Sequence, residues 1–110
     1  MRWEESFPFE GRIVWLTAEQ GGRMSGPPAT PAEHDYAATA HVPPWTEENG
    51  SASFVLRVAD RHGWTSRAEG TWLVQQDDER FLVHPGTVIV VTEGYKVVAY
   101  FHVDTVSSDR

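Results

Sequence analysis

The sequence predicts an all-β protein, a small closed antiparallel barrel of six or seven strands. Short runs rich in β-branched and aromatic residues recur along the 110 residues. Turn signals built on glycine and proline separate these runs roughly every ten residues, a spacing typical of small barrels and sandwiches. No stretch has the apolar spacing of an amphipathic helix. A closed barrel is favoured because it leaves no apolar strand edge open to a neighbouring chain.

Each expected strand is bounded by turn-forming residues. The expected strands cover residues 10–18, 34–42, 53–59, 71–76, 80–84, 87–92 and 95–106. Strict alternation places Ile13 and Trp15 on the same side of the first strand. Trp72 also falls within a strand, so Trp15 and Trp72 are both expected in the core.

The stretches between the strands are expected to be loops. Residues 20–33 contain three glycines and three prolines, which exclude a helix or a central strand. Residues 60–70 are polar and broken by two glycines. The polar residues 77–79 separate two apolar runs, which predicts a hairpin of 71–76 with 80–84.

Length and composition indicate one folded domain over residues 1–110, with a lead-in at 1–8 and a polar tail at 107–110. The chain contains no cysteine, which excludes thiolate zinc sites and cysteine nucleophiles. No apolar run reaches the length of a membrane span, and the acidic N-terminus is unlike a signal peptide. We therefore expect no membrane contact and a cytoplasmic location.

The formal net charge of −7 restricts the partners of the protein. Nucleic-acid affinity comes largely from Lys and Arg contacts to phosphate, and Lys96 is the only lysine. Binding to RNA or to an anionic membrane is therefore disfavoured. A basic protein partner is electrostatically favoured, although the same charge would also serve solubility alone.

Two stretches at opposite ends of the chain resemble a known family. Residues 9–23, FEGRIVWLTAEQGGR, are similar to the opening strand and corner of the C-terminal β-barrel domain of elongation factor Tu and related translational GTPases. Residues 88–103, VIVVTEGYKVVAYFHV, resemble that domain's closing hairpin, with Lys96 where the family prefers Arg. The resemblance implies a six-stranded barrel that packs against companion domains and touches the T-stem of aminoacyl-tRNA.

The resemblance also implies which family functions are missing. Gly94 matches the turn glycine that approaches the RNA backbone. Residues 30–34 match a family segment whose basic and aromatic members are absent here, which disfavours tRNA contact. The chain has neither the G-x-x-x-x-G-K-[ST] phosphate loop nor the Asn-Lys-x-Asp motif, so no GTP binding is expected.

Loop residues supply the candidate binding groups. Trp45 and Trp64 fall in loops, where each could anchor a partner or plug an end of the barrel. The stretch around Trp64 combines aromatic and cationic groups. Arg23 follows Gly21-Gly22 and could either hold an anion or pair with a nearby carboxylate. The expected binding residues are Arg23, Trp45, Arg61, Trp64, Arg67, Gly94 and Lys96.

No catalytic residue and no cofactor are expected. His41 and His102 lie in expected strands and could approach each other if those strands pair, with Asp35, Asp104 or Glu33 completing a metal site. The carboxylates at 47–48 and 77–79 fall in expected exposed turns, where solvated charge is the ordinary outcome.

The leading hypothesis is a non-catalytic binding module that acts through protein–protein contact, an elongation-factor-type barrel without its GTPase domain. One alternative is a weak tRNA- or RNA-binding domain, which predicts an arginine cluster on one face. A second alternative is a small metal-dependent enzyme.

Overall fold

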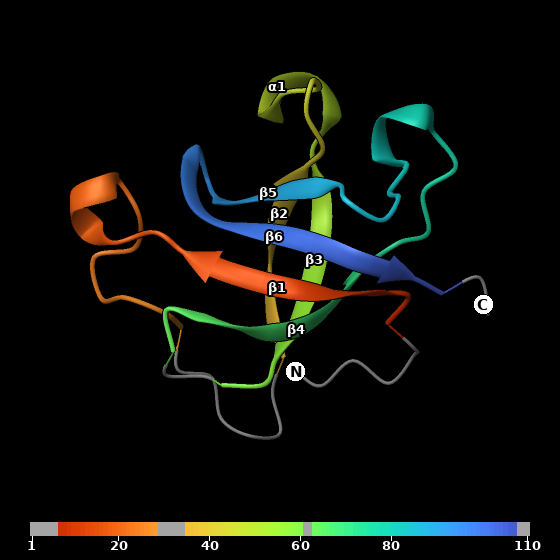
Figure 1. The fold of residues 1–110 in the computed structure, drawn as a ribbon. Helices are drawn as coiled ribbons and strands as arrows, with labels where there is room; N and C mark the ends of the chain where they lie inside the picture. The colour runs from red at the N-terminus through yellow and green to blue at the C-terminus, as the bar shows by residue number, and fades with distance from the viewer. Residues whose placement is uncertain (1–6, 29–34, 61–62, 108–110) are drawn as a thin grey trace.

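The computed structural model describes residues 7–28, 35–60 and 63–107. Within these ranges six strands form a closed antiparallel barrel, which confirms the predicted fold class (Figure 1). Their order around the barrel is β1-β4-β3-β2-β5-β6, and β1 closes it by pairing with both β4 and β6. The strands are β1 (Phe9–Trp15), β2 (Tyr36–His41), β3 (Ala52–Val58), β4 (Thr65–Trp72), β5 (Val88–Glu93) and β6 (Lys96–Val106).

The interior of the barrel is packed with apolar side chains from alternating strand positions. Ile13 and Trp15 of β1 are both buried, as the alternation predicts. Phe54 of β3 lies at the centre and contacts Phe101 of β6 at 6.1 Å and Trp72 of β4 at 4.9 Å between ring centroids. Rings at these separations pack favourably in addition to the area that they bury.

Aromatic pairs close both ends of the barrel. At the end where β1 finishes, Trp15 meets Tyr36 edge-to-face with ring centroids 5.3 Å apart. At the other end, Trp72 meets Phe81 edge-to-face at 5.1 Å. The aromatic pairs at the two ends therefore come from strand ends and, for Phe81, from the 3₁₀ turn η2.

The prediction for residues 60–84 is wrong in two respects. β4 (Thr65–Trp72) occupies most of the stretch expected to be a polar connection, and the hairpin of 71–76 with 80–84 does not form. Residues 79–81 form one turn of 3₁₀ helix instead, η2 (Glu79–Phe81).

Apart from Trp72 at its end, the inward residues of β4 are small, which explains why its pattern is hard to recognise. A Cβ built on Gly70 would lie 2.7 Å from the ring of Phe54 and 2.9 Å from that of Phe101. Ser66 and Ala68 are buried on the same strand. Small residues on β4 therefore make room for the large rings of Phe54, on the neighbouring strand β3, and of Phe101 on β6.

In the described part of the chain, helical structure is limited to single turns. Residues 45–51, expected to be a turn, contain α1 (Glu47–Gly50), and η1 (Ala18–Gln20) follows β1. Thr46 is the residue before α1, and its backbone N–H donates to the side-chain oxygen of Asn49 at 2.9 Å, which is the N3 half of a capping box. Over the described ranges, no helix is long and apolar enough to cross a membrane.

Candidate functional site

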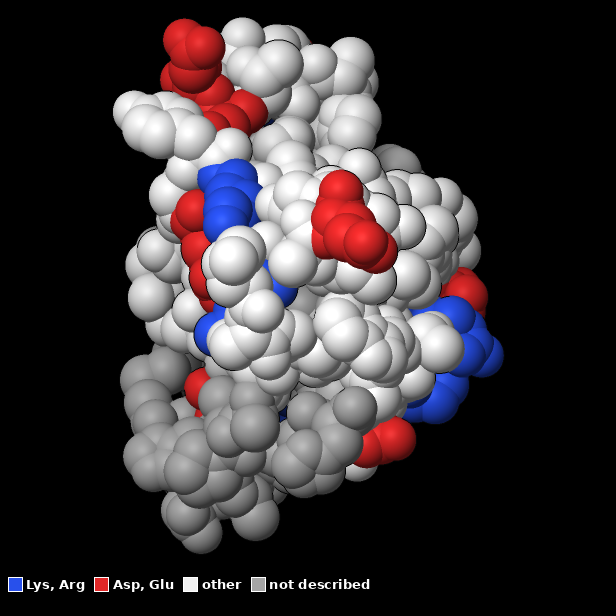
Figure 2. Space-filling view, turned by 90° about the vertical axis from the view of Figure 1, so that its left-hand side faces the viewer, with Lys and Arg blue, Asp and Glu red and all other residues white. Residues whose placement is uncertain are grey.

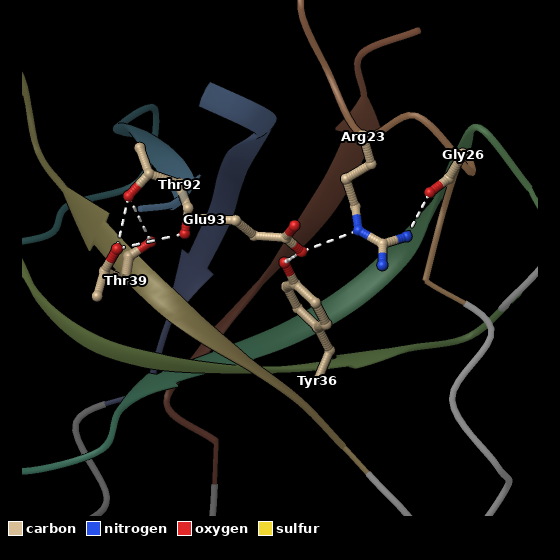
Figure 3. Close-up of polar contacts among 6 residues, drawn as sticks. All are labelled: Arg23, Gly26, Tyr36, Thr39, Thr92 and Glu93. Atoms are coloured by element: carbon tan, nitrogen blue, oxygen red, sulfur yellow. Dashed lines mark hydrogen bonds and ion pairs between the residues drawn. The ribbon is translucent and has the colours of Figure 1, made fainter. Parts of the chain in front are cut away.

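An ion pair joins two distant segments at the end of the barrel where β1 finishes (Figure 3). Arg23, in the loop after β1, donates from Nε to the carboxylate of Glu93 at the end of β5, at 2.8 Å. The Arg23 guanidinium also donates to the carbonyl of Gly26 at 2.5 Å. The hydroxyl of Tyr36 donates to the same oxygen of Glu93. Three segments of the chain therefore meet at one carboxylate.

Tyr36 connects this polar cluster to the core. Burial, together with the hydrogen bond to Glu93, raises the pKa of Tyr36 above its usual value, so the hydroxyl keeps its proton and can donate. Its ring lies against Trp15. Beside it, the hydroxyls of Thr39 and Thr92 bond at 2.6 Å between β2 and β5, next to Glu93 in the chain (Figure 3). The Glu93 carboxylate is thus fixed in place by its position on β5 and by its hydrogen bonds with Arg23 and Tyr36.

The same end of the barrel exposes three large apolar side chains. Tyr95 is 88% exposed, Met24 is 82% exposed and Trp64 is 46% exposed. A large apolar side chain gains nothing from contact with water, and neighbouring exposed ones are typical of binding surfaces. We call these three residues the loop-end surface.

Contacts among the loops place these residues together. The ion pair of Arg23 with Glu93 joins the segment that carries Met24 to the turn that carries Tyr95. Trp64 lies over the first of these loops, because a Cβ on Gly26 would be 3.4 Å from its ring. The carbonyl of Trp64 also accepts from the backbone N–H of Trp15 at 2.8 Å. In Figure 1 the loop after β1, the β5–β6 turn and the start of β4 lie on the left of the barrel.

Charges on this end are mixed, and ion pairs occur here and elsewhere on the barrel. Figure 2 faces it directly, and most of the surface is neutral, with basic and acidic groups next to one another. Among the described residues, four arginines form ion pairs with carboxylates. These pairs are Arg23–Glu93, Arg57–Asp35, Arg67–Asp104 and Arg80–Asp78. Paired guanidinium groups offer less to a phosphate than free ones do.

The structure gathers four of the seven predicted binding residues at the loop end. Trp64 and Arg23 both contact Gly26 in the loop after β1: the Trp64 ring lies over it, and the Arg23 guanidinium donates to its carbonyl. Gly94 forms the β5–β6 turn with a φ of 64°, a conformation that favours glycine. Lys96 is exposed and stands directly opposite Glu93 in the strand register. Of the two roles considered for Arg23, the structure shows the pairing with a carboxylate.

The remaining predicted binding residues do not join this surface. Arg67 faces outward on β4 and pairs with Asp104 of β6 at 2.6 Å. Trp45 is half-buried in the segment before α1. Arg61 and His62 lie outside the described residues, so the aromatic and cationic stretch around Trp64 is only partly visible.

The strand pairing on which the metal site depends is not present. His41 is on β2 and His102 is on β6, and β5 lies between these strands. Asp35 and Asp104 are each paired with an arginine. Within the described ranges no group of three or more potential ligands could hold a metal ion, and Glu33 lies outside them. Burial lowers the pKa of His41, which favours the neutral ring.

Sequence reasoning missed four residues of this end: Met24, Tyr36, Glu93 and Tyr95. Tyr95 has a local signal, because it follows the glycine of a tight turn where side chains point to solvent. The contact of Tyr36 with Glu93 has none, since these residues are 57 positions apart. Only the folded barrel brings them together.

Comparisons of this chain with protein-family models, with curated proteins and with solved structures found no match. The function of the protein is therefore inferred from the chemistry of its own surface.

Proposed function

We propose that the chain is a non-catalytic binding module that acts through protein–protein contact, and that the loop-end surface makes the contact. The supporting observation is that Met24, Trp64 and Tyr95 are each exposed on segments joined by the Arg23–Glu93 ion pair and by the contact of Gly26 with Trp64. Aromatic residues and methionine are enriched at the centres of protein interfaces. The resemblance to the C-terminal barrel of elongation factor Tu, which packs against companion domains, supports the same role.

The frame beneath the surface favours tight binding. Arg23, Glu93 and Tyr36 hold the two loops in place before any partner arrives. Trp64 is already half-covered, and tyrosine has few rotatable bonds, so both lose little conformational entropy on binding. The partner that fits is a protein with an apolar patch. The net charge of −7 also favours a basic partner during the approach.

Affinity capture from the cells that make the protein tests this function. The wild type is compared with Trp64→Ser and Tyr95→Ser, and with Val74→Ser as a control, since Val74 is exposed in the connection after β4. We expect one recurring partner that the control retains, and that each loop-end variant captures about tenfold less, as for a central interface residue. Equal capture by all four proteins would contradict the proposal.

RNA binding is a second candidate, favoured by one row of cationic side chains. On the outer face of the barrel, Arg12 of β1 stands between Arg67 of β4 and His102 of β6. Arg12 forms no ion pair within the part of the chain that the structure describes, although Arg67 does. A gel shift with total tRNA at low salt that weakens in Arg12→Ala would support this candidate, and no shift at all would remove it.

A further inference from the structure

A second surface feature lies on a different side of the barrel. A groove of about 420 Å³ runs between residues 42–45, which lead into α1, and residues 79–88, which lead into β5. Its volume falls in the range of pockets that hold a small ligand, about 300–1,000 Å³. Its apolar wall is formed by Val42, Pro43, Pro44, Trp45, Leu82 and Val88. We call it the Trp45 groove.

The apolar wall of the groove is accessible to a partner. Leu82 is 55% exposed, an unusual environment for leucine, and Trp45 is half-buried. Trp45 packs closely on the end of α1, because a Cβ built on Gly50 would lie only 2.8 Å from the Trp45 Cβ. The base of the Trp45 side chain is therefore packed against α1, and the partly exposed residue lines the groove.

A polar bridge joins the two walls of the groove. Arg80, at the centre of η2, donates to the carbonyl of Asn49 in α1 at 2.6 Å. The same guanidinium is held by both carboxylate oxygens of Asp78, at 3.0 Å from Nε and 2.9 Å from Nη2. These hydrogen bonds lower the pKa of Asp78, which keeps the carboxylate ionised. The groove is thus formed before a partner binds, and Figure 1 shows α1 and η2 together at the top of the barrel.

Carboxylates lie on or near both walls of the groove in the chain, about thirty residues apart. Glu79 lines the groove and Asp77 lies two positions before it, whereas Glu47 and Glu48 of α1 follow the lining residue Trp45 by two and three positions. The one guanidinium among the lining residues, that of Arg80, is already paired. An apolar wall between carboxylates is complementary to an apolar segment that carries positive charge.

We propose that the Trp45 groove binds a short basic segment of a partner protein. An apolar side chain of that segment packs against Trp45 and Leu82, and flanking Lys or Arg residues face the carboxylates on both sides. The proposal rests on the binding-module function but uses a surface separate from the loop-end surface. The two surfaces can therefore fail or succeed independently.

Selection of short random peptides displayed on phage, against the immobilised full chain, tests the proposal. We expect the enriched peptides to combine Lys and Arg with apolar residues. Chemical shifts of the ¹⁵N-labelled chain, measured with one synthesised peptide, should change at residues 42–48 and 77–88. We expect Leu82→Ser and a fourfold charge-neutral variant each to weaken this peptide about tenfold, and Val74→Ser to leave its affinity unchanged. The fourfold variant carries Glu47→Gln, Glu48→Gln, Asp77→Asn and Glu79→Gln.

Three results would overturn the proposal. The first is no enrichment of any peptide, and the second is enrichment without basic residues. The third is a set of shifts at Met24, Trp64 and Tyr95 instead of the groove, which would support the loop-end surface alone. A different result would overturn only the proposed role of the loop end. In that case the peptide binds the groove, but the loop-end variants capture the same partners as the wild type.

Discussion

The hydroxyl of Tyr36 donates a hydrogen bond to Glu93, and the same carboxylate oxygen accepts from Arg23 at 2.8 Å. One acidic side chain therefore joins the start of β2, the end of β5 and the loop after β1. The loop-end surface depends on this junction, because Met24 directly follows Arg23 and Tyr95 lies two positions after Glu93.

Removing the Tyr36 hydroxyl tests the junction. Tyr36→Phe keeps the ring against Trp15 but removes one of the two donors to the Glu93 carboxylate, leaving only Arg23, so we expect the free energy of unfolding to fall by about 1–3 kcal/mol. Urea denaturation followed by circular dichroism measures this change. Tyr95→Phe is the matched control, since its hydroxyl is exposed, and it should change stability by less than about 0.5 kcal/mol. Equal effects of the two substitutions would show that the hydrogen bond does not stabilise the fold.

The raised pKa of Tyr36 predicts how stability depends on pH. In the unfolded chain tyrosine loses its proton near pH 10.0, whereas folded Tyr36 keeps it to higher pH. Above that pH the folded state binds more protons than the unfolded state, so stability decreases as pH rises, by up to about 1.4 kcal/mol per pH unit. Below it the contribution is fully present.

Denaturation curves at several alkaline pH values check this dependence against Tyr36→Phe. The stability advantage of the wild type over the variant should be constant at neutral pH and should shrink once pH exceeds the usual tyrosine pKa. A constant difference across the whole range would mean that Tyr36 ionises equally in both states.

Arg23→Gln separates local order from global stability. The ion pair is partly exposed, so its loss should cost no more than about 1 kcal/mol. Hydrogen exchange at the backbone of Gly26, which donates to the carbonyl of Arg23 at 3.2 Å, should nevertheless become faster. Exchange at the core strand residue Val98 serves as the control and should follow only the global change. Unchanged exchange at Gly26 would show that the pair does not hold the loop.

Gly70→Ala tests the packing of the barrel interior. The new methyl group would approach the rings of Phe54 and Phe101, and we expect a loss of about 1–3 kcal/mol. Adding Phe54→Leu should relieve part of that clash, so the double variant should lose less than the sum of the two single variants. Additive losses, measured by urea denaturation, would contradict the proposed contact.

The sequence was sufficient for strands whose own side chains carry a strong pattern. β5 and β6 are rich in valine, and β1 alternates between buried and exposed positions, so their approximate positions are confirmed. β4 was missed because most of its inward residues are small. Their contribution to packing depends on the rings of Phe54 and Phe101, which fill the space beside them. The false hairpin arose because Trp72 and Phe81 resemble strand residues, whereas they meet as a plug at the end of the barrel.

The candidate surface was predictable only in part, for the same reason. Gly94 and Arg23 are marked by local turn chemistry, and Trp64 is a loop aromatic. Their gathering at one end depends on the partner of Arg23, and nothing local identifies Glu93 as that partner. The order in which the strands pair around the barrel decides which loops become neighbours, and no local sequence pattern indicates that order.

Site-specific photo-crosslinking tests the role of the loop end most directly. A photoreactive phenylalanine analogue is placed at position 95 in one protein and at position 74 in another, because Tyr95 and Val74 are both exposed but lie in different connections. We predict one recurring protein adduct from position 95, absent from position 74, that disappears when Trp64→Ser is added. An adduct formed equally from both positions, or from position 74 alone, would contradict a contact made by the loop-end surface.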